Sequence, residues 1–268
     1  MILTSEAALT AISTSRIEAS LALGRTSLGV VEAGPDLCWS ISGIPVASFN
    51  AVVRCLFGPY PDRQIDDVQR QFAARAMPFV WWVKGREEEL EKRLRNHGLD
   101  FESEESSGMA LSLTGLPHVL SGPLAVSVER ITERPHLRTW FATLLASFDA
   151  TADDRTLDRA TDVFAELSAH RANGWHFYLA RIDGHPVGTS ALHLGAAAGL
   201  YSVGTLPSVR RQGIGRALSG RALTDARSAG YAIATLTASE PGARLYEALG
   251  FTEYCRYREY VWRPPGIA

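Results

Sequence analysis

The stretch VGTLPSVRRQGIGRAL, from Val203 to Leu218, is the part of the sequence that decides the fold. It has the pattern of a strand end, a turn that contains Pro207, and a glycine-rich loop that opens a helix near Gly215. The first N–H groups of a helix have no partner inside the helix, and Gly213 and Gly215 let an anion approach the backbone. The stretch therefore predicts a phosphate site at a helix N-terminus.

Two common phosphate-binding loops do not fit this segment. A Walker loop places Lys-Ser or Lys-Thr directly after its glycines, and no such pair follows here. A Rossmann loop opens the first βαβ unit of its domain with GxGxxG spacing, whereas this loop follows an expected antiparallel meander. Formal positive charge at the loop comes from Arg210, Arg211 and Arg216.

The spacing Arg210-x-x-Gly213-x-Gly215 resembles the acyl-CoA pyrophosphate motif of the GNAT superfamily of N-acetyltransferases. A second motif, ARLYEALGF over Ala243 to Phe251, resembles the late helix of that family, which carries a tyrosine next to the thioester. The resemblance covers about Leu124 to Trp262, where the expected element order β-α-α-β-β-β-α-β-α-β agrees with it. It implies an α/β fold with a mixed sheet, and acetyl-CoA as co-substrate without a metal.

The resemblance also assigns residues to the co-substrate. It implies that the backbone of Val203, Gly204 and Thr205 pairs with pantetheine and polarises the acyl carbonyl. Ser239 stands where many members of the family have Asn, and this departure puts a side-chain contact there in doubt, although a hydroxyl can still donate. The loop implied to hold the pyrophosphate comprises Arg211, Gln212, Gly213, Ile214, Gly215 and Arg216, with Arg210 preceding it.

Tyr246 is the candidate catalytic residue, since a phenol with an ordinary pKa of about 10 is protonated at neutral pH and can donate to a departing thiolate. The family resemblance supplies most of this assignment, and the alternative is a tyrosine that only packs the helix. The general base is not readable from the sequence. Candidates are His193, Glu240 and Glu129. A histidine like His193, on a strand of the core hairpin, is more often a structural histidine than a base.

The chain is expected to have two domains, over residues 1–122 and 123–268, joined by a linker at 114–123 with the sequence TGLPHVLSGP. The first domain shows a weak internal echo of the second: strand, helix, PFVWWV strand and helix. Aligning Gly98 with Gly250 places Leu94 opposite Tyr246, and no RxxGxG motif precedes PFVWWV. This half resembles the degenerate amino-terminal domain of two-domain acetyltransferases, and an unrelated small α/β unit is the alternative.

Composition excludes several other classes. With 27 Lys plus Arg against 29 Asp plus Glu, the net charge of −2 argues against a general nucleic-acid binder. The three cysteines, Cys38, Cys55 and Cys255, lie far apart without a CxxC pair, so neither a disulfide framework nor a zinc site is expected. No secretory signal or membrane-spanning run is recognisable, and the expected location is the cytoplasm.

These observations predict an N-acetyltransferase in which a primary amine attacks the thioester of acetyl-CoA directly. A covalent intermediate is not expected, because no cysteine falls in a nucleophile motif. The alternatives are a non-catalytic acyl-CoA-binding sensor or scaffold, and an enzyme that uses an acyl carrier protein or a longer acyl group. The acceptor, a small-molecule or peptide amine, and the oligomeric state are not encoded in a readable form.

Overall fold

The structure is a computed structural model that describes residues 3–102, 105–115, 126–169 and 174–265. Residues 116–123 of the expected linker lie outside the described residues, and so does the expected domain boundary at 122/123.

The chain forms an α/β structure with strands from both halves in one mixed sheet. The described helices are α1 (Ser5–Gly24), α2 (Pro61–Ala73), α3 (Glu88–Asn96), α4 (Arg134–Ala146), α5 (Asp154–Ala169), α6 (Ile214–Ser228) and α7 (Glu240–Glu247). The strands are β1 (Val30–Ala33), β2 (Leu37–Ile41), β3 (Ala51–Cys55), β4 (Phe79–Lys84), β5 (Asp100–Phe101), β6 (Ser106–Ser112), β7 (Ser127–Ile131), β8 (Trp175–Ile182), β9 (His185–Leu194), β10 (Ala198–Thr205), β11 (Ile233–Ala238) and β12 (Thr252–Trp262).

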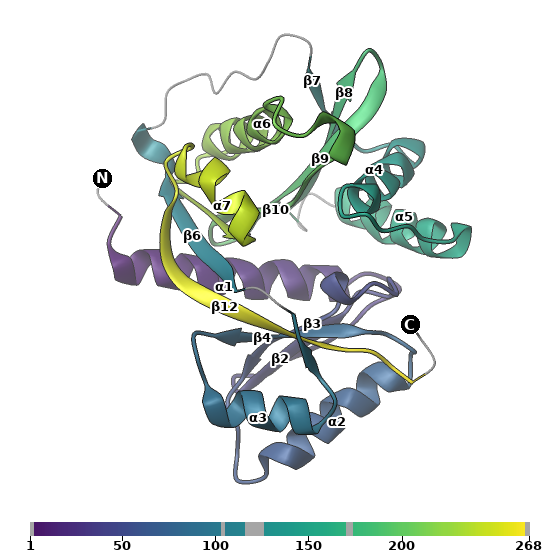
Figure 1. Ribbon diagram of the computed structural model, residues 1–268, viewed down its shortest axis with the longest axis vertical. Helices are drawn as coiled ribbons and strands as arrows, with labels where there is room; N and C mark the ends of the chain where they lie inside the picture. Colours follow the sequence, from purple (N-terminus) through teal and green to yellow (C-terminus); the bar gives the residue numbers. More distant parts are fainter. Residues whose placement is uncertain (1–2, 103–104, 116–125, 170–173, 266–268) are drawn as a thin grey trace.

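The sheet order β1-β2-β3-β4-β12-β6-β11-β10-β9-β8-β7 shows that each half lends a strand to the other. β6 belongs to the first half of the chain but lies antiparallel to β11. β12, the last strand, crosses from the upper to the lower half in Figure 1 and pairs with β4. The sheet is therefore continuous across the expected domain division. The division into two domains at residues 122/123 stays a prediction.

Both halves contain a β-α-β-α unit with a parallel strand pair. β3 and β4 are parallel through Ala51–Val80 and Val52–Trp81, and β10 and β11 are parallel through three pairs that end at Leu200–Leu236. The helices that connect them are α2 and α6, and α3 and α7 follow. The echo between the two halves that the sequence suggests is thus present in the strand directions and the element order.

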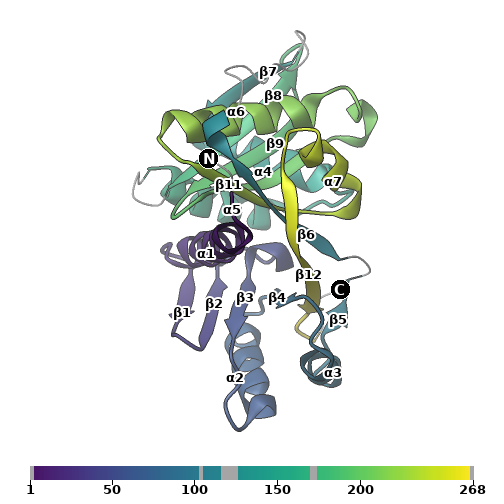
Figure 2. The ribbon, with the colours of Figure 1, turned by 90° about the vertical axis from the view of Figure 1, so that its left-hand side faces the viewer.

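Helix α1 lies across the middle of the molecule, between the two halves (Figures 1 and 2). Thr4 caps its first turn by accepting a hydrogen bond from the N–H of Ala7. Small side chains such as Ala8, Ala19 and Ala22 let the helix approach the strands closely, and they are buried. Helix α1 contacts strands of both halves and so fixes one half against the other.

Helices α4, α5 and α6 cover the two faces of the C-terminal part of the sheet, whereas α2 and α3 pack on the N-terminal part. Helices α4 and α5 pack on β8 and β9 around a cluster of aromatic rings that includes Trp140, Phe141 and Phe164. Helix α6 packs on β8, β9 and β10 through Ile214 and Leu218, in a separate core that also contains Tyr246. The glycine-rich loop, which begins α6, is therefore held against the end of β10.

Candidate active site

Strand β10 is bulged just before the glycine-rich loop. Its register against β9 shifts between Tyr201, opposite Ala191, and Gly204, opposite Thr189, so three steps on β10 match two on β9. Ser202, in the bulge, has a φ of +51°, and its carbonyl oxygen accepts a 3.0 Å hydrogen bond from the hydroxyl of Thr189. A bulge of this kind turns ladder groups of the strand away from their usual partner.

β10 and β11 separate at the same level. Their last ladder pair is Leu200–Leu236, although β10 continues to Thr205 and β11 to Ala238. Val203, Gly204 and Thr205, which the sequence assigns to pantetheine, lie on the part of β10 that is not paired with β11. A strand edge of this kind can form ladder hydrogen bonds with an extended amide-containing ligand.

The loop before α6 is shaped for an anion. Arg211 has a φ of +63° and Gly213 a φ of +81°, so two left-handed residues curve the backbone into the helix start. No side chain caps the helix, and its first ladder bond from the N-cap runs from the N–H of Ala217 to the carbonyl of Gly213. The N–H groups of Ile214, Gly215 and Arg216 precede that bond, and with the helix dipole they are suited to an anion. Binding of the pyrophosphate there stays a prediction.

Side chains around this loop differ in their exposure. Arg211 and Gln212 are exposed, whereas Ile214 is buried in the core and Arg216 is half-buried. A Cβ on Gly215 would lie 3.1 Å from Cδ2 of Leu245 on α7, so the absence of a side chain there lets α6 and α7 pack closely.

The guanidinium of Arg210 forms hydrogen bonds with backbone carbonyl groups. Its Nη2 donates to the carbonyl of Ser147 at 2.8 Å, and its Nε faces the carbonyl of Thr205 at 3.4 Å. The residue therefore holds the loop against the end of α4, and its contribution to phosphate binding stays a prediction.

Tyr246 lies on α7 with its side chain buried and its ring edge-on to Phe251, at 5.9 Å between centroids. Burial raises the pKa of its phenol well above the usual value, so the hydroxyl stays protonated. Burial is the one cause of this shift, with no contribution from a hydrogen bond to another described residue. The side chain is thus a proton donor without a protein acceptor, as a contact with a leaving group requires.

Ser239 is the N-cap residue of α7, directly after β11. Its carbonyl accepts the N–H groups of Gly242 and Ala243, but its side chain makes no capping bond and is exposed. The hydroxyl is therefore free to meet a ligand where the two strands have separated.

Two of the three candidate bases, His193 and Glu129, lie away from this opening, whereas Glu240 directly follows Ser239. His193 is buried beside Trp175, with 5.1 Å between the ring centroids, and pairs with Gly199 before the bulge. Glu129 is on the edge strand β7 and forms a 2.9 Å ion pair with Arg181. Glu240 is exposed at the start of α7. None of the three lines the large cavities next to the site.

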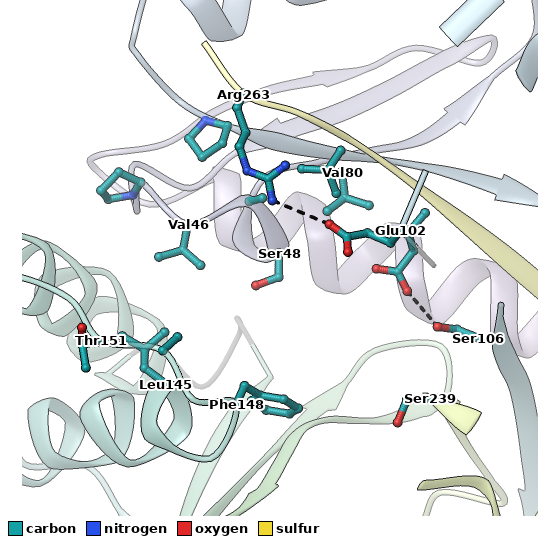
Figure 3. Close-up of a pocket in the computed structure, with 16 residues that line it drawn as sticks. Val46, Ser48, Val80, Glu102, Ser106, Leu145, Phe148, Thr151, Ser239 and Arg263 are labelled. Atoms are coloured by element: carbon teal, nitrogen blue, oxygen red, sulfur yellow. Dashed lines mark hydrogen bonds and ion pairs between the residues drawn. The ribbon is translucent and has the colours of Figure 1, made fainter. Parts of the chain in front are cut away.

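Sequence reasoning missed a fourth carboxylate, Glu259 on β12. It lines a cavity of about 730 Å³ between the two halves. Ser239 and Ser106, which line the same cavity, are labelled in Figure 3. A second cavity, of about 470 Å³, is lined by Tyr201 and Ser202 of the bulged strand. In the sequence Glu259 is one of several alternating polar residues of an aromatic-rich strand. The pairing of β12 with β6 and with β4, where Glu259 lies opposite Trp82, brings it here.

The part of the chain that the structure describes contains neither an activated thiol nor a cluster of metal ligands. Cys38, Cys55 and Cys255 are free, and burial raises the pKa of each thiol, that of Cys55 to about 12. No group of three or more His, Cys, Asp or Glu side chains among the described residues is placed to hold a metal ion. Among these residues no helix is both long and apolar enough to span a membrane.

Comparison with known proteins identifies the part of the chain that forms this site. Residues 173–253, which include the bulged strand, the glycine-rich loop and Tyr246, match the family model for the acetyltransferase (GNAT) domain. The chain carries a domain of the GNAT acetyltransferase superfamily. A mycothiol acetyltransferase of Thermomonospora curvata is 34% identical over 109 residues, and the match spans 37% of this chain and 37% of that relative's length.

Solved structures share the fold over almost the whole chain. A GCN5-related N-acetyltransferase from Kribbella flavida superimposes with a TM-score of 0.63 at 21% identity, and covers 94% of this chain and 96% of its own. A tandem GNAT protein from the clavulanic acid biosynthesis pathway gives a TM-score of 0.56 at 14% identity, over 93% of this chain and 89% of its own. The GNAT domain of the C-terminal half thus lies in an architecture that tandem GNAT proteins share.

Proposed function

We propose that the chain transfers the acetyl group of acetyl-CoA to a primary amine, by direct attack of the amine on the thioester. The observation that carries the proposal is the opening between β10 and β11 beyond Leu200–Leu236, next to the uncapped start of α6. Unpaired strand groups and a phosphate cradle lie side by side there, as a pantetheine arm with a pyrophosphate requires. The GNAT family model over residues 173–253 supports the same reading.

Each part of the site has a role in this reaction. Bound acetyl-CoA would supply the acyl group and a thiol leaving group. The backbone of residues 203–205 holds the pantetheine arm and donates toward the acyl oxygen, and the loop 211–216 holds the pyrophosphate. Ser239 offers a hydroxyl to the arm at the end of β11.

Tyr246 would act as the general acid. Attack by the amine forms the N–C bond, and as the C–S bond breaks the phenol donates its proton to the sulfur. The attached nitrogen loses one proton, which passes through water to the phenolate and restores Tyr246. The raised pKa of the buried phenol keeps that proton in place at neutral pH. With all three thiols held protonated by burial, direct attack is favoured over an acyl-cysteine route.

We propose a small-molecule or peptide amine as acceptor and the cytoplasm as location, and both follow from the sequence reasoning and the GNAT match. A screen of an amine library with acetyl-CoA, read by thiol release and by the mass of the product, tests the function. At least one amine should release thiol above the rate of hydrolysis. Tight acetyl-CoA binding without transfer to any amine would favour a sensor instead.

A further inference from the structure

The cavity that contains Ser239 and the cavity that contains Ser202 form one cleft between the halves of the chain. Both are lined by the same five residues: Val46, Ser48, Leu145, Phe148 and Ala150. In Figure 3 Val46 and Ser48 face Leu145 and Phe148 across the cavity, from the N-terminal and the C-terminal half. Together the two parts enclose space for a molecule larger than an acetyl group.

This cleft ends at the two strands between which the thioester is proposed to lie. One part reaches Ser202, in the bulge of β10, and the other reaches Ser239, at the end of β11. A molecule in the cleft would therefore approach the acyl carbon from the side of the N-terminal half. The cleft is accordingly the acceptor side of the site.

The charged groups of the cleft are Glu102, Glu259 and Arg263. Arg263 is paired with Glu102, at 3.7 Å between Nη2 and Oε1. Oε1 of Glu259 accepts a 2.8 Å hydrogen bond from the hydroxyl of Ser106, and no cation among the described residues lies within ion-pair distance of this carboxylate. Glu259 is thus the acidic group of the cleft that still lacks a positive partner.

The sheet register places Glu259 near the end of β11. Ser107 of β6 pairs with Ala238, so Ser106 is next in line to Ser239. Ser106 also pairs with Tyr257 of β12, two residues before Glu259. The carboxylate that Ser106 holds therefore lies one strand away from the hydroxyl of Ser239.

We propose that the acceptor is a cationic primary amine with an apolar body, and that its ammonium group binds Glu259, which then accepts the amine's proton. The inference rests on the proposed function, because it assumes a thioester between β10 and β11. In the step, an N–H bond of the ammonium breaks and an O–H bond forms on Glu259. The free amine then attacks, the attached nitrogen gives its second proton through water to the Tyr246 phenolate, and Glu259 returns the proton it holds to water.

The surroundings of Glu259 suit a proton acceptor. Burial raises the pKa of the carboxyl, and Glu102 raises it further, while the hydrogen bond from Ser106 and the charge of Arg16 on α1 lower it. The net direction is upward, which makes the carboxylate a stronger base than an exposed glutamate. The guanidinium of Arg263 reaches the same cavity but is paired with Glu102.

The apolar body of the acceptor follows from the other end of the cleft. There Leu144, Leu145, Phe148 and Trp175 line the cavity beside the bulge. The side chain of Phe148 is 64% exposed, an unusual state for a large apolar group. An acceptor with a ring or alkyl chain would cover it.

Benzylamine is a suitable probe, because it joins an ammonium group to an aromatic ring. Glu259→Gln keeps the size of the side chain and should lower kcat/KM for benzylamine by about 100-fold or more. Benzylamine binding to the protein–CoA complex, measured by calorimetry, should weaken in parallel, while acetyl-CoA affinity stays within about twofold. The matched control is Glu32→Gln on the edge strand β1, an exposed glutamate that lines neither cavity, and it should match wild type in all three measurements.

Ser106→Ala gives a second, independent readout. Loss of its hydrogen bond should raise the pKa of Glu259, so the acidic limb of the pH–rate profile should move to higher pH while the rate at alkaline pH is kept. In Glu259→Gln this limb should vanish and leave only the rise that follows deprotonation of free benzylamine.

Several outcomes would overturn the inference without touching the proposed function. One is wild-type turnover of other amines but not of benzylamine. Another is turnover of 4-(aminomethyl)benzoate as fast as that of benzylamine, because with the ammonium on Glu259 its carboxylate would have to lie in the apolar part of the cleft. A third is unchanged kinetics in Glu259→Gln, or an acidic limb that Ser106→Ala does not move. Failure of the wild type to acetylate any amine would instead refute the proposed function.

Discussion

Nη2 of Arg210 donates a 2.8 Å hydrogen bond to the carbonyl oxygen of Ser147, the C-cap residue of α4. The two segments also meet at Gly204, where a Cβ would lie only 2.8 Å from Cβ of Ser147. The end of α4 thus fixes both the bulged strand and the start of the phosphate loop. Arg210 therefore stabilises the contact between α4 and the loop, a role that cannot be read from its position in the sequence motif.

This relationship separates Arg210 from Arg211. Arg210→Ala should lower the free energy of unfolding by about 1 kcal/mol, because the carbonyl groups of Ser147 and Thr205 lose the hydrogen bonds that this exposed guanidinium donates. Arg211→Gln should leave unfolding unchanged but weaken acetyl-CoA binding, with a smaller dependence on salt, because a charge near the phosphates is lost. Urea denaturation and calorimetry at two salt concentrations measure the two effects. Equal behaviour of both variants would contradict the distinction.

Gly213 tests the phosphate cradle. Its φ of +81° is costly for a β-branched residue, and a side chain would stand where the pyrophosphate is proposed, so Gly213→Val should abolish acetyl-CoA binding. Gly230→Val is the matched control, since Gly230 follows the other end of α6 at φ +90° with open space around it. Both variants should lose similar thermal stability, and only the first should lose binding. Tight binding by a folded Gly213→Val protein would refute the cradle.

Much of the C-terminal half could be predicted from the sequence, because its signals are local. Hairpin residues at Asp183 and Gly184, alternating strands and a glycine-rich helix start each act within a few residues, and the structure forms β8, β9, β10 and α6 there. The family resemblance added the order of these elements and is confirmed by the fold.

The parts that could not be predicted depend on long-range pairing. Helix α1 has small and polar residues around much of its surface, so its periodicity gives little signal, and it is stabilised by packing between the halves. The exchange of β6 and β12 joins residues about 150 positions apart, as in the bond from Ser106 to Glu259. Glu259 reaches the cavity only through this exchange of strands, so no local sequence motif indicates its position.

The N-terminal half should not bind acyl-CoA. Its helix α2 starts at Pro61 without a glycine loop, and Leu94, opposite Tyr246 in the echo, is fully buried. The rings of Phe57 and Trp81 stack at 6.2 Å next to the parallel pair β3–β4. We therefore expect one CoA per chain in calorimetry. A stoichiometry of two would contradict the proposed degeneracy of this half.

Tyr246→Phe tests the general acid and separates an enzyme from a sensor. The change keeps the ring and its edge-on contact with Phe251 and removes only the hydroxyl. Acetyl-CoA affinity should stay nearly constant, while turnover with an accepted amine falls by about 10² to 10⁴, the range typical of a lost general acid. Phe251→Leu, which alters the packing but keeps the phenol, is the control and should change stability more than turnover.

The pH dependence sharpens the same test. Because burial raises the pKa of the Tyr246 phenol, the wild-type rate should show no loss from its deprotonation up to at least the ordinary pKa of about 10. If the departing thiolate takes its proton from this phenol, a poorer leaving group than CoA should be penalised more in Tyr246→Phe than in wild type, since protonation matters most when the thiolate is least stable. If Tyr246→Phe has the turnover of wild type across the pH profile, both with acetyl-CoA and with the thioester of the poorer leaving group, Tyr246 is not the general acid and is only a core residue of α7.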